Sequence, residues 1–253
     1  MQKIRLIARL DIKNEFVIKG IHLEGLRKIG DPNILAKKYY DEGIDEIIFM
    51  DAVASLYGRN NFFHIIEKAC KEIFIPITIG GGIRSVHDIE LALKSGADKI
   101  TLNTQAIKNP CFIKEASRIY GSQCIVGSIE AKKKENWKWE AYIDNGREQT
   151  GIDAIEWAEK LEELGIGELC VTSIDKEGTK KGFDIELIDQ ICKKVNIPVI
   201  ASGGANNSND IIKVCKANSN LNAVAVASML HYNIESIKDA KHNLLKNNIL
   251  SRI

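Results

Sequence analysis

The most constraining feature of this sequence is an internal repeat. The segment 75–83 (IPITIGGGI) recurs at 197–205 (IPVIASGGA), a displacement of 122 residues, and a displacement of 119 residues places Asp11 over Glu130. Self-similarity over half of a chain indicates two copies of one structural unit. The repeat therefore predicts a pseudo-twofold site with two acids, two glycine turns and a ligand that has two anionic ends.

Composition restricts the class of protein. The 253 residues are 45% apolar, enough for a sizeable core, and the net charge of +1 gives no basic surface for nucleic acid or an anionic membrane. The six cysteines form no CxxC pair and read as reduced core residues, so neither a metal site nor a disulfide framework is expected. With no signal peptide and no long apolar run, we expect a cytoplasmic protein without a cofactor.

Strand-like and helix-like segments alternate along the whole chain. Eight such pairs without a linker favour a closed parallel barrel over an open sheet, so we predict one (β/α)8 TIM barrel over 1–253, with half-barrels of about 1–121 and 122–253. The expected strands are 4–10, 46–51, 75–79, 99–103, 123–129, 168–173, 197–201 and 222–227. The expected helices are 32–43, 60–73, 85–95, 109–120, 152–165, 184–195, 207–217 and 233–247.

Acidic residues end several of these strands. Asp11 and Glu130 end the first and fifth, which face each other across an eight-stranded ring, and two opposed acids suit general acid–base catalysis. Asp51 and Asp175 end the second and sixth strands and are candidates for contacts to ligand hydroxyls. The long segments 14–31 and 131–151 follow the two acid-bearing strands and are expected to cover the site.

The glycine turns at 80–82 and 202–204 each lie between a strand and a helix. Without a Cβ the backbone can approach an anion closely, and each turn is followed one unit later by small polar residues. Those residues are Asn103-Thr104 in the first half and Ala227-Ser228 in the second. Together they predict two phosphate cups on opposite sides of the barrel mouth.

Charged residues also begin four strands, at the opposite face of the barrel. They are Arg5, Glu46, Lys99 and Glu168. Ordinary solvation of strand edges explains such a pattern equally well. If all four side chains point inward, they form a neutral ring that closes the bottom of the barrel.

Several motifs together resemble one family. The stretches 8–13 (ARLDIK), 79–84 (IGGGIR), 96–99 (GADK), 172–179 (TSIDKEGT) and 201–205 (ASGGA) are similar to the cyclase subunit, the HisF family, of imidazole glycerol phosphate synthase. The resemblance implies a lyase of histidine biosynthesis. Such a subunit takes ammonia from a glutaminase partner that docks at the N-terminal face, and it converts a bisphosphate substrate.

The resemblance also implies roles for individual positions. Asp11 matches the essential acid/base residue and Lys19 the lysine of a mobile first loop. Gly82, Asn103 and Thr104 would hold one phosphate, and Gly178, Gly204, Ala205 and Ser228 the other. Arg5, Glu46, Lys99 and Glu168 match a ring through which ammonia enters.

Two residues depart from the family pattern. Glu130 stands where the family has aspartate, and Arg9 stands where it has a small residue. Alternation along the strand puts Arg9 on the inward face, where a buried guanidinium needs an anion, and we expect that anion to be Glu130. These departures leave two alternatives open. One is a paralogue that channels ammonia for amidino modification of surface-polysaccharide sugars, with weak or no cyclase activity. The other is a phosphosugar isomerase barrel of similar design.

Overall fold

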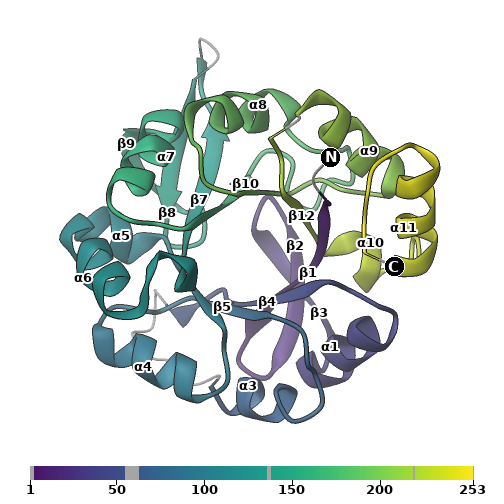
Figure 1. The fold of residues 1–253 in the computed structure, drawn as a ribbon, viewed down its shortest axis with the longest axis horizontal. Coiled ribbons are helices and arrows are strands. Elements are labelled where there is room, and N and C mark those ends of the chain that lie inside the picture. The colour runs from purple at the N-terminus through teal and green to yellow at the C-terminus, as the bar shows by residue number, and fades with distance from the viewer. Residues whose placement is uncertain (1–2, 55–62, 136–137, 219, 253) are drawn as a thin grey trace.

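The computed structural model of the chain describes residues 3–54, 63–135, 138–218 and 220–252. Within these ranges eight parallel strands pair into a ring, and the pairing of β7 with β10 closes it (Figure 1). The predicted TIM barrel is therefore confirmed. Around the ring the strands are β10 (Glu168–Ser173), β11 (Val199–Ser202), β12 (Ala223–Val226), β1 (Arg5–Lys13), β4 (Glu46–Asp51), β5 (Ile77–Gly80), β6 (Lys99–Leu102) and β7 (Ile125–Lys133).

Helices surround the ring (Figure 1). The longer ones are α1 (Pro32–Asp41), α3 (Phe63–Ala69), α4 (Val86–Lys94), α6 (Pro110–Tyr120), α7 (Ala154–Glu163), α8 (Ile185–Lys194), α9 (Ser208–Ala217) and α11 (Ile237–Lys246). The short helices α5 (Thr104–Lys108) and α10 (Ser228–His231) and the 3₁₀ turn η1 (Ser122–Cys124) were not predicted. No helix in the described part of the chain is long and apolar enough to cross a membrane.

The predicted bounds agree closely with these elements. Strands 46–51 and 168–173 coincide with β4 and β10, and the other predicted strands and helices have counterparts that begin and end within about four residues of the predicted bounds. The first residues of the predicted helix 60–73, numbers 60–62, lie outside the described residues. Helix α1 begins as its sequence requires, because the Asp31 carboxylate accepts hydrogen bonds from the amides of Asn33 and Ile34.

The two long segments after β1 and β7 form antiparallel hairpins. β2 (Phe16–Ile21) pairs with β1 and with β3 (Glu24–Gly30), while β8 (Trp139–Ile143) pairs with β7 and with β9 (Glu148–Asp153). We expected connecting loops in both places. Strand pairing instead fixes the side chains of these segments relative to the mouth of the barrel.

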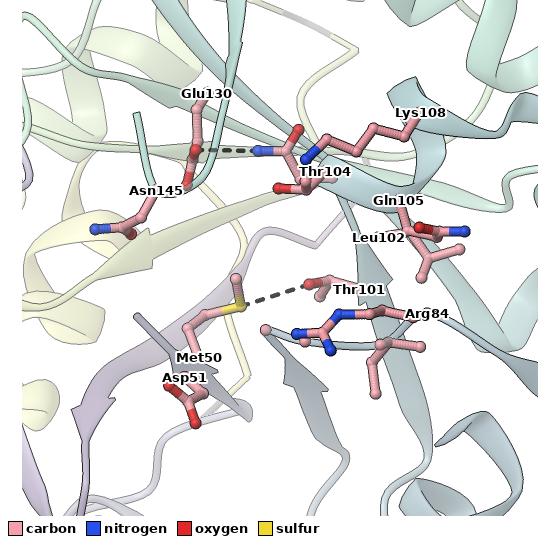
Figure 2. A pocket seen from close by; sticks show the side chains of 14 residues that line it. Met50, Asp51, Arg84, Thr101, Leu102, Thr104, Gln105, Lys108, Glu130 and Asn145 are labelled. Atoms are coloured by element: carbon pink, nitrogen blue, oxygen red, sulfur yellow. Dashed lines mark hydrogen bonds between the residues drawn. The ribbon is translucent and has the colours of Figure 1, made fainter. Parts of the chain in front are cut away.

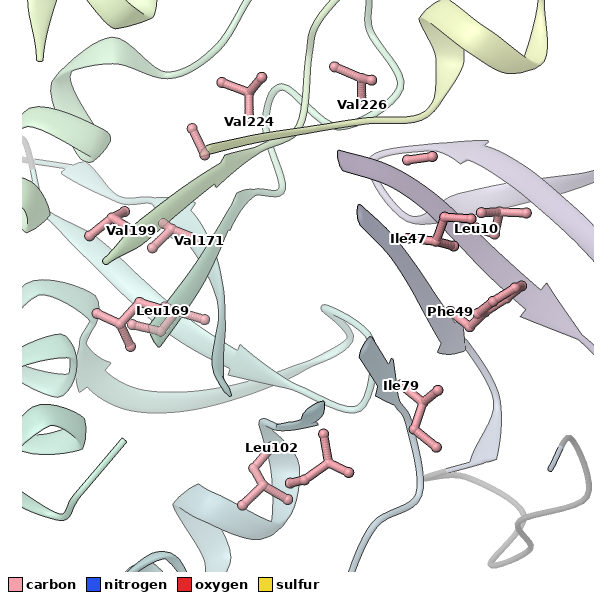
Figure 3. Close-up of a cluster of buried hydrophobic side chains, with 14 of the residues drawn as sticks. Leu10, Ile47, Phe49, Ile79, Leu102, Leu169, Val171, Val199, Val224 and Val226 are labelled. Carbon is pink, nitrogen blue, oxygen red and sulfur yellow. The ribbon is translucent and has the colours of Figure 1, made fainter. Parts of the chain in front are cut away.

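Alternation along the strands separates two sets of side chains. Residues such as Leu10, Phe49 and Val224 belong to the large apolar cluster between the ring and the helices (Figure 3). The alternate residues point into the barrel, where Ile7 and Ile48 join a second, smaller apolar cluster. This period of two arranges the inward residues of each strand in successive layers.

The layers can be followed along β1. Arg5 lies in the lowest layer, Ile7 in the apolar cluster, Arg9 above it and Asp11 nearest the mouth. On the facing strand β7 the corresponding residues are Val126, Ser128 and Glu130. The barrel interior therefore changes from charged to apolar and then to polar and charged, from bottom to mouth.

Candidate active site

Asp11 is buried between two cations. Its Oδ1 atom accepts a hydrogen bond of 2.8 Å from Arg9 Nε, and its Oδ2 atom lies 3.6 Å from Lys19 Nζ. Burial raises the pKa of Asp11, but Arg9 and Lys19 outweigh it and hold the pKa below its ordinary value. Asp11 is therefore a carboxylate at neutral pH.

Lys19 comes from the first hairpin and also forms an ion pair with Glu177, which follows β10. Burial lowers the pKa of Lys19 to about 8, against the opposing effect of Asp11. The backbone amide of His22 donates to the carbonyl of Glu177, so the hairpin lies on the segment after β10. Our sequence reasoning missed Glu177, although it sits in the TSIDKEGT stretch beside Gly178.

Glu130 has different surroundings. Its Oε2 atom accepts hydrogen bonds from Asn103 Nδ2 at 3.0 Å and from the backbone amide of Gly146 at 2.8 Å. Burial raises the pKa of the Glu130 carboxyl to about 7, against the opposing effect of Arg9. Both hydrogen bonds fall on Oε2, so a proton on this group belongs on Oε1.

The predicted pairing of Arg9 with Glu130 is wrong. Arg9 is buried and pairs with Asp11, and its Nη1 atom donates to the hydroxyls of Thr172 at 2.8 Å and Ser202 at 3.3 Å. Among the described residues, no ion pair joins Arg9 to Glu130. Burial lowers the pKa of Arg9, but Asp11 and other nearby acidic groups together raise it by more. The guanidinium therefore stays charged although it is buried.

A cavity of about 180 Å³ lies beside Glu130. Gly82, Asn103 and Thr104, the residues of the first predicted cup, line it together. Sequence reasoning missed Arg84, Lys108 and Asn145, which also line it. Figure 2 shows the side chains of Arg84, Thr104, Lys108 and Glu130 around this space. Arg84 comes shortly after the glycine turn, and Lys108 comes shortly after Thr104. A basic residue close to each motif is a signal that the sequence alone could have given.

The second predicted cup is also assembled, but the space that all four of its residues border is small. Gly178, Gly204, Ala205 and Ser228 border a space of about 10 Å³ that Arg9 and Lys19 also line. Gly178 has a φ of +73°, and a side chain there would collide with the Gly20 carbonyl of the first hairpin. The hairpin therefore packs directly on this cup.

Two predicted ligand contacts are occupied by the protein itself. Asp51 lines the first cavity, and its Oδ1 atom accepts hydrogen bonds from the amides of Val53 and Ala54. Asp175 accepts a hydrogen bond from the amide of Lys133 at 2.7 Å and lines neither cup. These contacts are typical of carboxylates that stabilise turns and strand ends.

The four charges at the bottom of the barrel form the predicted closed ring. Arg5 contacts Glu46 at 2.7 Å and also Glu168, while Lys99 contacts Glu168 at 2.8 Å and Glu46 at 3.3 Å. Each cation bridges both anions, so the ring is electrically neutral. The edge-solvation interpretation is wrong, because the side chains point toward one another instead of outward.

This arrangement can perform acid–base chemistry between the two predicted cups. Asp11 and Glu130 line neighbouring cavities that share Asn145, and their surroundings lower the pKa of Asp11 but raise that of Glu130 to about 7. Two carboxyl groups with opposite protonation states are a usual arrangement for a base and an acid. In the described part of the chain, no group of three or more potential metal ligands occurs.

Comparisons with known proteins agree with one another. A family model described as histidine biosynthesis protein matches residues 5–235. A protein of Legionella pneumophila is 58% identical over 204 residues, which cover 81% of this chain and 96% of the relative. A protein of Lactococcus lactis subsp. cremoris (strain MG1363) is 47% identical over 98% of this chain and 96% of the relative. A protein of Bacillus cereus (strain AH187) is 44% identical over 98% of both chains. All three carry the name imidazole glycerol phosphate synthase subunit HisF.

Proposed function

The chain belongs to the HisF family, the cyclase subunits of imidazole glycerol phosphate synthase, a lyase of histidine biosynthesis, and we propose that Asp11 and Glu130 carry out its acid–base chemistry. The substrate is the bisphosphate phosphoribulosyl-formimino-aminoimidazole carboxamide ribotide. Ammonia cleaves and cyclises it to imidazole glycerol phosphate and aminoimidazole carboxamide ribotide. The observation that carries this proposal is the contrast between the two acids at the barrel mouth: Asp11 lies between the cations Arg9 and Lys19, whereas Glu130 accepts hydrogen bonds from neutral amides.

Asp11 is the base in this proposal. Arg9 and Lys19 keep it ionised, so it can accept protons from the attacking nitrogen as the new carbon–nitrogen bonds form. Glu130 is the acid. With a pKa of about 7, Glu130 can donate a proton to the departing ribotide near neutral pH. The cavity beside Glu130 gives the ribotide access to this carboxyl group.

The two ends of the substrate are assigned to the two cups. Gly82, Asn103 and Thr104 would bind one phosphate, with Arg84 and Lys108 as nearby cations. Gly178, Gly204, Ala205 and Ser228 would bind the other after the first hairpin moves, because the space that all four border is only about 10 Å³, whereas a cavity of about 550 Å³ lies beside Gly178 and Ser228. Lys19 belongs to that hairpin and would return toward Asp11 once the substrate is bound.

Membership of the family implies a glutaminase partner. We assign its docking surface to the N-terminal face of the barrel, where Arg5, Glu46, Lys99 and Glu168 close the ring. Ammonia released by the partner would pass through this ring and then along the apolar interior beside Ile7 and Ile48. Each cation of the ring contacts both anions, so at least one ion pair must break before ammonia can pass.

Turnover with ammonium salt in place of glutamine tests the chemistry without the partner. The chain should convert the bisphosphate, and Asp11→Asn and Glu130→Gln should each lower kcat by roughly 10²- to 10⁴-fold. Glu148→Gln is a matched control, because it neutralises an exposed acid on the second hairpin. No turnover by the wild-type chain would reject the cyclase proposal and favour the ammonia-channelling alternative. Wild-type rates in both variants would reject the assigned roles.

A further inference from the structure

The turn between β8 and β9 touches the first cavity and Glu130 at the same time. Asp144 makes the cavity contact. Its backbone amide donates to the Thr104 hydroxyl at 3.1 Å, that hydroxyl donates to Asp144 Oδ1 at 3.4 Å, and Lys108 Nζ lies 3.8 Å from Oδ2. Two residues later, the Gly146 amide donates to Glu130. Three residues of one turn thus connect the proposed phosphate donors to the proposed acid.

The conformation of the turn makes this connection rigid. Asp144, Asn145 and Gly146 have φ angles of +52°, +58° and +74°, so all three are left-handed. The turn spans the four residues 144–147 between β8 and β9, and the Arg147 amide donates to the Ile143 carbonyl at 3.1 Å across it. A displacement of the Asp144 side chain from Thr104 will therefore also move the Gly146 amide.

Asp144 occupies the groups that a phosphate would use. Its carboxylate accepts from a hydroxyl and faces an ammonium group, which are the same kinds of donor that bind a phosphate. A phosphate and the Asp144 carboxylate carry charge of the same sign, so they cannot share Thr104 and Lys108 without repulsion. Anion binding therefore disfavours the present position of Asp144.

We propose that Asp144 is a positioning residue that couples phosphate binding in the first cavity to the placement of Glu130. Without a ligand, Asp144 clamps the turn against Thr104, and the Gly146 amide holds the Glu130 carboxyl in place. A phosphate displaces the Asp144 carboxylate, the turn shifts, and Glu130 is released from Gly146 toward the substrate. The inference rests on the proposed function, since it takes the first cavity to be a phosphate site.

Nuclear magnetic resonance with inorganic phosphate tests this coupling at constant ionic strength. The amides of Gly82 and Thr104 report on the cavity, and the Gly146 amide reports on the turn. In the wild-type chain all three should shift with one Kd, and the Gly146 proton should move upfield as its hydrogen bond to Glu130 is lost. Asp144→Asn keeps the left-handed turn, because asparagine tolerates this backbone conformation, but it removes the competing charge.

Asp144→Asn should bind phosphate about tenfold more tightly, and the Gly146 amide should already be near its released position before phosphate is added. Glu148→Gln removes an exposed acid of the same hairpin and should retain the wild-type Kd within about twofold. The coupling is wrong if Gly146 stays still while Gly82 and Thr104 shift, or if Asp144→Asn and Glu148→Gln bind phosphate equally. If Gly82 and Thr104 do not respond in any variant, the phosphate assignment itself fails and the coupling fails with it.

Discussion

Replacing Arg9 with methionine should destabilise the barrel most strongly at pH values where Asp11 is ionised. Arg9 is buried, and it supplies the 2.8 Å contact to Asp11 and two hydrogen bonds to the hydroxyls of Thr172 and Ser202. Methionine keeps the apolar part of the side chain and adds no buried charge. The variant therefore removes the closest cation from Asp11 without introducing a second defect of similar size.

The expected cost follows from the remaining contacts. Removing one partner of a buried ion pair costs about 3–5 kcal/mol. Lys19 stays 3.6 Å from Asp11, so we expect the lower end, about 3 kcal/mol at pH 7.5. In the wild-type chain the pKa of Asp11 is depressed, so this group stabilises the fold above its unfolded pKa, and that contribution is lost as the pH falls through the folded pKa.

The variant weakens this contribution. Without Arg9, the effect of burial on Asp11 is opposed chiefly by Lys19, so the pKa of Asp11 should rise and the ionised group should stabilise the fold less at neutral pH. Where the variant's carboxyl is protonated, the difference between the two proteins shrinks by about 1.4 kcal/mol for each pH unit. The cost of Arg9→Met should therefore be smaller at pH 4.5 than at pH 7.5.

Urea unfolding at pH 4.5, 6.0 and 7.5 measures these differences. Arg118→Met is the matched control, because Arg118 is exposed on α6 and its loss should change stability by less than about 0.5 kcal/mol. Arg9→Met should also cost less in an Asp11→Asn background, where no carboxylate is left unpaired. A cost that is independent of pH and unchanged in that background would refute the role of Arg9 as the counter-ion of Asp11.

Two further predictions concern the ring and the acid. Lys99→Ala should lower glutamine-dependent turnover more than ammonium-dependent turnover, because it breaks two of the four ion pairs at the proposed entrance, whereas the exposed Lys94→Ala should affect neither. Equal losses in both assays would restrict the ring to a structural role. At constant free ammonia, turnover should fall as the pH rises through about 7, because Glu130 loses its proton there, and Glu130→Gln should remove this limb from whatever activity remains. An unchanged alkaline limb in Glu130→Gln would assign the proton to another group.

Much of the barrel could be predicted because strand alternation and glycine turns are local signals. The ring of four charges followed from the same alternation, since it only required that strand-initial residues point inward. The partner of Arg9 could not be chosen in this way. Alternation places both acids on the inward face, but it does not rank their distances from a long side chain. Arg9 pairs with Asp11 because Asp11 lies two residues along the same strand, roughly 7 Å away, which is within reach of an arginine side chain.

The two hairpins were missed for a different reason. Their outer strands β3 and β9 are mostly exposed or half-buried and lack the apolar runs of the buried ring. Their pairing depends on contacts with residues that are distant in sequence, such as the Lys19–Glu177 ion pair and the Asp144–Thr104 contact. A reading of local pattern therefore identifies these segments as covers for the site but cannot say which side chains they bring to it.

The same repeat that relates the two acids also explains why they behave differently. The displacement of 119 residues that maps Asp11 onto Glu130 maps Arg9 onto Ser128, so only one half supplies an inward guanidinium beneath its acid. It also maps Lys19 onto Lys138, which is exposed, while Lys19 is buried against Asp11. Asp11 is thus surrounded by cations, whereas Glu130 receives its hydrogen bonds from neutral amides. The two acids correspond in the sequence repeat but have different neighbours, so the site places an ionised base opposite an acid whose pKa is raised to about 7, as a reaction that both removes and delivers protons requires.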